Sequence, residues 1–562
     1  MKKLATFIAL VLMISCKSQY SAVSKQGVKS QPNILWIVTE DISPTLSMYG
    51  DSTAKTPNLD ALAKESLIYD NAFTTVGVCA PSRSSIITGV HPTTLGTIHM
   101  RTGKDVFSWG KRKYEKKIPI KDINGKAIIQ YSAVIPDNIK CFPEYLRAHG
   151  YYCTNNQKTD YQFAAPVTAW DENNGKAHWR HRPKAKPFFA VFNIGTTHES
   201  RLWRNENLPL TINPKDVSVP PYLPDNDATR ETIARNYSNI ELMDKEVGEF
   251  IRQLKADGLY DNTIIFFYSD HGGPLPRQKR EILDSGLKVP FMIKDIHSKN
   301  KGRTNRLISF VDLAPTLLSL AGIDIPGYME GYAFMGNQDK VKRKYIYASS
   351  DRFDEYTDRI RAVRNNRFLY LKNYFPQLPK YKDISYRKKI PMMPVFLNLK
   401  EKGKLNDTQN IWFGTKTDEE LYDCTNDPYN LHNLAYNPKY KNILDEFRME
   451  YDKYNQKHTD LGQIPESRMI EMMWPHYNQP KTLKPEITKV NGRISISCKT
   501  KGASIAYILS DDPNKSFDFN DSWQLYSKPV KSDGKKYIYV VAERIGYKTS
   551  DMKKYDLILS QK

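Results

Sequence analysis

Cysteine is scarce in this chain of 562 residues, which contains only 6. So few cysteines exclude a scaffold held together mainly by disulfides. No stretch beyond the N-terminal segment is long and apolar enough to cross a bilayer. Acidic residues are outnumbered by basic ones, 62 against 83, so the net charge is +21. A basic surface attracts polyanions such as nucleic acid, anionic lipid or acidic polysaccharide, and charge alone does not choose among them.

A short apolar run stands at the N-terminus. Lys2 and Lys3 precede residues 4–14, which are too few to span a membrane and are typical of a secretory signal. The letters LMISC, ending at Cys16, resemble a bacterial lipobox, and a plain signal peptide cleaved elsewhere is the alternative. We expect residues 1–16 to be a lipoprotein-type signal peptide and Cys16 to carry a lipid that anchors the chain to a membrane. The protein is then exported, to the periplasm or outer membrane of a Gram-negative bacterium.

The cysteines allow disulfides in such a compartment. Once Cys16 and Cys79 are set aside, Cys141, Cys153, Cys424 and Cys498 remain. Four cysteines allow three pairings, and the alternative is that they stay free and buried.

Buried strands alternate with helices in the first part of the chain. Near-continuous apolar runs at residues 33–38, 187–195, 262–273 and 287–293 are typical of strands buried on both faces. Residues 56–66 and 229–255 have the apolar spacing and start signals of helices. The pattern predicts an α/β fold with a large, mostly parallel sheet sandwiched by helices.

The pattern changes after about residue 340. The runs YIYASS and RFLYLKNYF predict a smaller antiparallel subdomain, and the Pro-rich residues 474–486 are typical of a linker. The alternating runs RISISCK and KKYIYVVAERIGY predict a small β module at the end. We assign residues 30–375 to the main α/β domain, 376–476 to a C-terminal subdomain and 484–562 to a β-rich accessory module.

Polar residues follow three of the predicted strands. Glu40 and Asp41 follow the first, His198 the second, and Asp270 and His271 the third. Functional groups of such sheets gather beyond the carboxyl ends of the strands. Carboxylate oxygens suit Ca²⁺ or Mg²⁺, which favour the histidine nitrogen less, and simple helix capping is the alternative for any single acid. Together the three strand ends predict a metal site.

The stretch GVCAPSRSSIITG places a cysteine at the start of a predicted helix. Pro81 suits the first turn and Gly89 the C-terminal cap, so Cys79 lies at the helix N-terminus. Backbone N–H groups and the helix dipole favour an anion there, and Arg83 lies one turn further on the same face. A free cysteine in this position can be a nucleophile.

This stretch resembles the signature of the type I sulfatases of the alkaline phosphatase superfamily, Cys-x-Pro-x-Arg followed by Thr-Gly at Thr88 and Gly89. Further segments match the family in order: PNILWIVTEDIS, TPNLDALAKES, FYSDHGG, KREILDSGLKVP, VDLAPTLLSLAGI and ELYDCTNDPYNLHNLA. The resemblance covers about residues 32–450. It implies an alkaline phosphatase-like fold and points to the bacterial polysaccharide sulfatases related to heparan N-sulfatase.

The resemblance implies two cofactors. Cys79 is expected to be converted to formylglycine, by a formylglycine-generating enzyme or an anaerobic maturase. One Ca²⁺ is expected on Glu40, Asp41, the modified Cys79, Asp270 and His271. Glu40 stands where the family more often has Asp, and His271 where many members have Asn.

The resemblance also implies catalytic roles. Arg83 holds the hydrated formylglycine, and Lys158 and Lys279 match lysines near the sulfate. His198 is our candidate for the acid that protonates the leaving alcohol. Asp160 stands where the family has a histidine, two residues beyond the lysine that Lys158 matches, which leaves open the group that takes the proton from the hydrate.

We expect sulfate ester hydrolysis on a sulfated polysaccharide or its oligosaccharides, either a marine algal polymer such as ulvan or a glycosaminoglycan. Nucleic acid is not an expected partner. His99, Arg101, Asp351 and Arg352 are candidate substrate-binding residues. The alternatives are a heparan-type N-sulfamidase, a phosphatase or phosphodiesterase of the same superfamily, and a non-catalytic glycan-binding protein.

Overall fold

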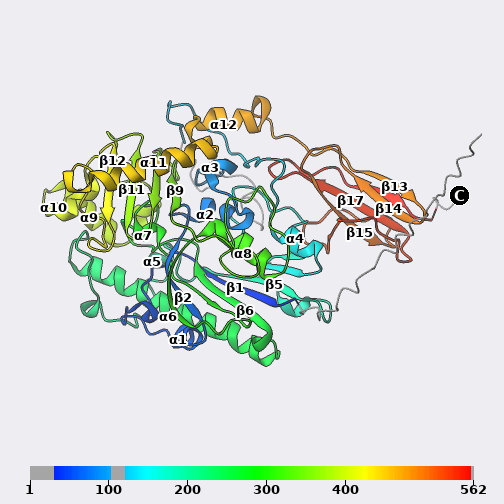
Figure 1. Ribbon diagram of the computed structural model, residues 1–562, viewed down its shortest axis with the longest axis horizontal. Helices are drawn as coiled ribbons and strands as arrows, with labels where there is room; N and C mark the ends of the chain where they lie inside the picture. The colour runs from blue at the N-terminus through cyan, green and yellow to red at the C-terminus, as the bar shows by residue number, and fades with distance from the viewer. Residues whose placement is uncertain (1–30, 103–119, 559–562) are drawn as a thin grey trace, which may run out of the picture. The chain divides into compact units, whose positions relative to one another are not determined.

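The main sheet places the carboxyl ends of its central strands at one edge. The computed structural model describes residues 31–102 and 120–558, so the predicted signal peptide and Cys16 lie outside the described residues. Within that range the sheet has eight strands in the order β4-β3-β5-β1-β6-β7-β2-β8 (Figure 1). Their bounds are β1 Asn33–Thr39, β2 Leu67–Phe73, β3 Tyr152–Asn156, β4 Glu172–Asn173, β5 Phe188–Ile194, β6 Thr263–Ser269, β7 Phe291–Lys294 and β8 Gly302–Ser309. Only β7 pairs antiparallel with its neighbours, so the predicted mixed, mostly parallel sheet is confirmed.

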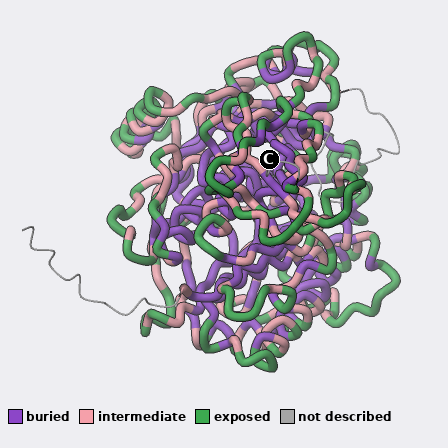
Figure 2. Tube along the Cα trace, turned by 90° about the vertical axis from the view of Figure 1, so that its right-hand side faces the viewer, coloured by how far each residue is buried: buried purple, intermediate pink, exposed green. Residues whose placement is uncertain are grey.

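Helices cover both faces of this sheet. Side chains alternate along β1, so Leu35 and Ile37 pack with α1 (Pro57–Ala63) and α6 (Asp227–Ala256), while Trp36 faces the other side. There it packs with residues of α2 (Cys79–Thr88), α4 (Pro143–Ala148) and α8 (Leu313–Leu320). All of β1 is buried. In Figure 2 the buried residues, drawn in purple, lie mainly in the interior. The near-continuous apolar sequence of β1 follows from this burial on two faces.

A second sheet is antiparallel, in the order β12-β11-β10-β9. Its strands are β9 Ile346–Ser350, β10 Ile360–Arg364, β11 Phe368–Asn373 and β12 Glu419–Asp423. α11 (Lys441–Lys457) packs on it through Leu444, Phe447 and Tyr451. The boundary that we assigned at residues 375/376 separates β11 from β12, which pair directly, so the subdomain begins near residue 346.

The C-terminal β module is packed against the α/β domain. It contains the hairpin β13 (Glu486–Val490) and β14 (Arg493–Ser497) and the sheet β16-β15-β17-β18, which are Gln524–Leu525, Ser504–Ser510, Tyr537–Glu543 and Lys553–Asp556. Glu543 accepts a hydrogen bond from the Val167 backbone N–H at 2.7 Å, and Arg147 donates to the Trp523 carbonyl at 2.6 Å. Ile545 belongs to the main core. Trp474, at the start of the predicted linker, is itself buried.

The five cysteines within the described residues are all free: Cys79, Cys141 and Cys153 are buried, and Cys424 and Cys498 are partly exposed. The alternative without disulfides therefore holds for this part of the chain. Among the helices of residues 31–102 and 120–558, none has both the length and the apolarity to span a bilayer.

Candidate active site

β1 ends in a tight turn that places the carboxylates of Glu40 and Asp41 at the same edge of the sheet. Asp41 has a left-handed backbone (φ 54), a conformation that aspartate tolerates better than most residues. Its N–H donates to Asp270 Oδ1 at 3.3 Å, and the next N–H, of Ile42, donates to Ser269 Oγ at 2.9 Å. These bonds join the ends of β1 and β6, so Asp41 and Asp270 are brought together as predicted.

Cys79 is the first residue of α2, and Gly89 ends this helix with φ 72, as the sequence predicts. No side chain caps the helix start, which follows Val78 in an extended conformation. Gly77, just before it, lies against the Glu281 backbone carbonyl, with which any side chain would collide. Cys79 Sγ lies 3.3 Å from His271 Nε2. The helix start thus meets the end of β6.

The predicted metal ligands form two overlapping groups that share Cys79. Glu40, Asp41, Cys79 and His198 make one group, and Cys79, Asp270 and His271 the other, with donor atoms within 4.8 Å of one another in each. Asp41 Oδ1 is buried and accepts no hydrogen bond from a described residue, although His271 Nε2 lies 3.1 Å away. A buried carboxylate oxygen in this state fits a cation ligand.

Charge around His271 also indicates an attraction for cations. Burial alone would lower the pKa of His271, but the negative charges of Asp270, Asp41 and the Cys79 sulfur outweigh it and raise that pKa to about 10. A divalent cation at the same place would require the neutral ring, because protonated histidine cannot ligate.

Three cations surround Cys79, and each is paired with a carboxylate. Arg83 Nε donates to Asp270 at 3.0 Å. Lys279 Nζ donates to Asp41 at 2.6 Å, and Lys158 Nζ donates to Glu40 at 2.7 Å. Beyond its Asp270 bond, Arg83 donates through Nη1 to Asn193 at 2.6 Å, while its buried Nη2 has no partner in the described structure. The guanidinium can therefore still donate a hydrogen bond from Nη2 to an anion in the site.

The buried charges stabilise one another. Burial would raise the pKa of Asp41, but Lys279, His198 and His271 hold it well below its usual range. Burial would lower the pKa of Lys279, but Asp41, Cys79 and Glu199 raise it well above its ordinary value. Both groups are therefore ionised at neutral pH, and the electrostatic field of the site is fixed before a substrate arrives.

His198 lies in the loop after β5. Its Nε2 is 3.9 Å from Glu40 Oε2, and its Nδ1 lies 2.9 Å from Ser200 Oγ. Burial and the positive charges of Lys279 and Lys158 lower the pKa of His198 well below its ordinary value, so the ring is neutral at neutral pH. Asp160, the departure from the family pattern, lies with Oδ2 3.7 Å from Lys158 Nζ.

Three charged residues behind the site were missed at the sequence level. Arg280 forms a bidentate pair with Glu199, with distances of 2.9 and 2.7 Å, and its Nε donates to Asp354 at 3.0 Å. The Glu199 backbone N–H donates to Asp41 Oδ2 at 2.7 Å. The available signal was adjacency, since Glu199 follows His198 and Arg280 follows Lys279.

Of the predicted substrate-binding residues, Arg101 borders the site. Its Nε donates to Asp354 at 3.1 Å, and its guanidinium lies 5.6 Å from the centre of the Tyr386 ring. That ring is 6.4 Å from the His198 ring. Arg101 is thus connected to the catalytic candidates through Asp354 on one side and Tyr386 on the other.

The other three predictions of this kind are corrected. Arg352 is 1% exposed, and its donors are used by Glu466 and by two backbone carbonyls. Asp351 is buried in a pair with Arg361. His99 is buried, and its Nδ1 accepts the Arg352 N–H at 3.3 Å. Arg361 lies 10 residues after Asp351 on β10, and Glu466 lies 114 residues after Arg352, so the motif alone could not reveal that these side chains are internal.

Comparisons with known proteins point to one family. The family described as "Sulfatase" matches residues 32–179 and 176–323, and the family described as "N-sulphoglucosamine sulphohydrolase, C-terminal" matches residues 277–392. An ulvan-active sulfatase of Formosa agariphila is 44% identical, over 97% of this chain and 95% of its own length. Human N-sulphoglucosamine sulphohydrolase is 24% identical, over 79% of this chain and 94% of its own.

A solved structure of a protein in complex with its substrate, D-glucosamine-2-N,6-O-disulfate, has the same fold. It superposes with a TM-score of 0.52 at 16% identity and covers 78% of this chain and 100% of its own.

Proposed function

The chain belongs to the sulfatase family and is a sulfuric ester hydrolase, and we propose that its substrate is ulvan or a related sulfated algal polysaccharide, or oligosaccharides released from it. The 44% identical relative named as ulvan-active, which matches 97% of this chain, supports this choice. A glycosaminoglycan is the alternative polymer.

One observation carries the proposal: the start of α2 lies among three buried or half-buried cations, Arg83, Lys158 and Lys279. A sulfate group is an anion, and preorganised cations stabilise the charge that it carries during transfer. Because each cation already has a carboxylate partner, its position does not depend on the substrate.

We infer that Cys79 is converted to formylglycine and that one Ca²⁺ is held by Glu40, Asp41, Asp270 and His271 with the modified residue. The hydrated formylglycine supplies an oxygen nucleophile, and the cation supplies Lewis-acid stabilisation of negative charge. The unsatisfied Asp41 Oδ1 supports the cation, and three carboxylates suit Ca²⁺. The His271 nitrogen is the least typical Ca²⁺ ligand of the set.

The remaining residues of the site bind the sulfate group and protonate the leaving alcohol. Arg83 offers its free Nη2 to the sulfate, and Lys158 and Lys279 neutralise charge on its oxygens. Burial and the charges of Lys279 and Lys158 lower the pKa of His198, and a bound anion would offset the two lysine charges and so favour the protonated ring. Ser200 orients His198 through Nδ1, which leaves Nε2 to deliver that proton to the leaving alcohol.

We propose that the chain is exported, with residues 1–16 removed as a signal peptide and Cys16 lipidated, and that it anchors to a membrane facing the periplasm or the outside. A formylglycine-generating enzyme or an anaerobic maturase is then a required partner. Labelling of Cys16 with a fatty acid analogue, absent in a Cys16→Ser variant, tests the anchor.

The function is tested by producing the enzyme together with a formylglycine-generating enzyme and measuring sulfate release from ulvan oligosaccharides. We expect the peptide that contains Cys79 to have lost sulfur and gained oxygen by mass spectrometry. Cys79→Ala should lower sulfate release by at least about 10³-fold, with unchanged thermal unfolding because alanine fits a helix start. Chelation should inhibit the wild type, and added Ca²⁺ should restore it. Faster release of phosphate than of sulfate from matched esters would contradict the proposal.

Cleavage of N-sulfate is a second candidate, because residues 277–392 match the C-terminal family of N-sulphoglucosamine sulphohydrolase. Sulfate release from glucosamine N-sulfate and from glucosamine 6-O-sulfate, compared under equal conditions, decides between the two bond types. A preference for the N-sulfated sugar would favour an N-sulfated glycan over the algal polysaccharide as the substrate.

A further inference from the structure

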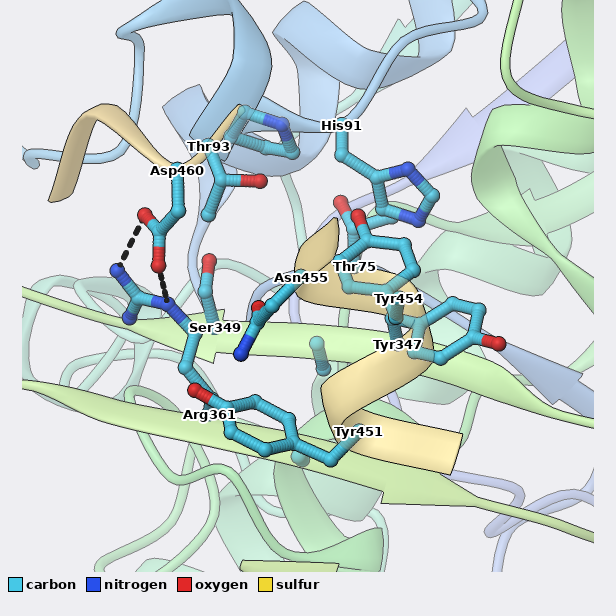
Figure 3. A pocket seen from close by; sticks show the side chains of 13 residues that line it. Thr75, His91, Thr93, Tyr347, Ser349, Arg361, Tyr451, Tyr454, Asn455 and Asp460 are labelled. Carbon is cyan, nitrogen blue, oxygen red and sulfur yellow. Dashed lines mark hydrogen bonds and ion pairs between the residues drawn. The ribbon is translucent and has the colours of Figure 1, made fainter. Parts of the chain in front are cut away.

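A large open cleft lies at the edge of the main sheet opposite the active site. Its volume is about 570 Å³, which is within the usual range of ligand sites, about 300–1,000 Å³. By contrast, the pocket between α3 (Pro92–Leu95), α11 and the second sheet has about 20 Å³, room for about one water molecule (Figure 3). Size therefore selects the open cleft as a candidate for a molecule larger than water.

The topology places this cleft far from Cys79. Leu67 and Tyr69 line it from the first half of β2, and Thr304, Asn305, Arg306 and Leu307 line it along β8. β2 and β8 run parallel to each other, and β2 runs parallel to β6 through the antiparallel β7, so the active site lies beyond the carboxyl ends of these strands. None of the residues that line the cleft belongs to the two ligand groups that share Cys79. The cleft is therefore not part of the catalytic pocket.

The lining exposes amide side chains. Tyr69 and Phe334 also line the cleft, but both rings are buried in the main core and close its base without exposing a ring face. Asn300, Asn305 and Asn366 are exposed around it, and their side-chain amides make no hydrogen bond to another described residue. An amide offers a donor and an acceptor side by side, which matches pairs of sugar hydroxyl groups.

The cleft is bordered by arginines that are paired with carboxylates and by lysines that are not. The arginines are already neutralised, since Arg306 pairs with Asp339 and Arg343 with Asp312. The lysines are not: five exposed lysines of residues 298–301 and 338–344 form no ion pair within the described part of the chain. They are Lys299, Lys301, Lys340, Lys342 and Lys344. Among the lining carboxylates only Asp295 lacks a cationic partner, so the cleft and its borders attract anions.

We propose that this cleft is a second saccharide site, which binds a sulfated segment of the polymer whose sulfate esters are hydrolysed at Cys79. The inference rests on the proposed polysaccharide substrate. Sugar hydroxyls bind the asparagine amides, and Lys342 and the neighbouring lysines bind sulfate groups. Binding here keeps the polymer on the enzyme between reactions, so it lowers the KM of a long chain and leaves that of a short one unchanged.

The test compares Lys340→Glu/Lys342→Glu with a matched control, Lys245→Glu/Lys402→Glu. Lys342 lines the cleft and Lys340 lies two residues before it in the sequence, whereas the control makes the same change of charge at exposed lysines of two other segments. We expect the cleft variant to raise KM for ulvan by about fivefold or more, with kcat unchanged and KM for a sulfated disaccharide unchanged. The control should resemble the wild type on both substrates. Equal changes on polymer and disaccharide, or none on either, would overturn the inference.

A binding experiment separates this inference from the proposed function. In the Cys79→Ala background, electrophoresis through gels that contain ulvan should retard the parent and the control variant but not the cleft variant. Neutral dextran should retard none of them. This result supports the cleft even if no sulfate is released by the wild type. Equal retardation of the cleft and control variants would refute the cleft, and equally strong lysine-dependent binding of duplex DNA would refute its assignment to a saccharide.

Discussion

Cations at the two edges of the main sheet are held in opposite ways. At the carboxyl edge, Arg83, Lys158 and Lys279 are largely buried and each is paired with a carboxylate. At the opposite edge, Lys340 and Lys342 are exposed and have no ion-pair partner among the described residues. The first arrangement fixes geometry, and the second leaves charge available to any anion that arrives.

The difference follows from desolvation. A buried cation is stable only when a partner offsets the loss of hydration, so the catalytic cations are linked to Asp41, Asp270 and Glu40 in one cluster. Such a cluster is rigid, which suits the stabilisation of one transition state. Exposed lysines keep their hydration and can adapt to irregular spacing of sulfate groups along a polymer.

The largest contrast between the two edges is expected from removing one lysine at each. Lys279→Met should lower kcat/KM by about 10²-fold or more and lower the free energy of unfolding by about 3–5 kcal/mol, because it leaves the buried Asp41 carboxylate without its lysine partner. Lys342→Met should leave both kcat on a disaccharide and the unfolding midpoint unchanged. Urea unfolding and sulfate release measure both variants. Equal stability of the two would show that the Asp41 cluster does not depend on Lys279.

Acid is expected to lower the stability of the buried interior without acting on the exposed cleft. Burial lowers the pKa of His99 to about 4 from its ordinary 6.5. The unfolded chain therefore binds a proton between these pH values that the folded chain does not, so stability is present above pH 6.5 and is lost as the pH falls toward 4. The loss from this residue is about 3 kcal/mol. None of the residues that line the cleft is a histidine.

Urea unfolding at several pH values measures this effect. His99→Gln should remove the corresponding part of the slope of unfolding free energy against pH, whereas the cleft variant Lys342→Met should keep it. An unchanged slope in His99→Gln would mean that His99 takes up its proton without unfolding.

A change in salt concentration is expected to give the smallest difference between the two edges of the sheet. Exposed charges are screened over about 8 Å at physiological ionic strength, and buried pairs are screened much less. Raising NaCl should therefore increase KM for ulvan by a few-fold, about threefold, while kcat on a sulfated disaccharide changes little. Steady-state kinetics at several salt concentrations measure this, and the Lys340→Glu/Lys342→Glu variant should have lost most of the salt dependence.

Much of the fold was predictable because burial leaves a local pattern. β1 is buried on both faces and is apolar throughout, and α6 carries a regular apolar stripe, so both were located within a few residues. The pairing of β11 with β12 was not predictable, because a long insertion separates the two strands and pairing across it leaves no periodic signal. The packing of the C-terminal module was also not predictable, since Glu543 and Val167 meet across 376 residues.

The sequence by itself determined the chemistry of the site: Cys79 at a helix start, and Asp41, Asp270 and His198 beyond strand ends. These features depend on short stretches whose spacing is set by one helix or one strand. The tertiary structure alone decided the partners. It buried Arg352 against Glu466, placed Glu199 and Arg280 behind Asp41, and opened the cleft beside Lys342 at the far edge. Pairing and exposure depend on which distant segments meet, and that is settled only when the whole core packs.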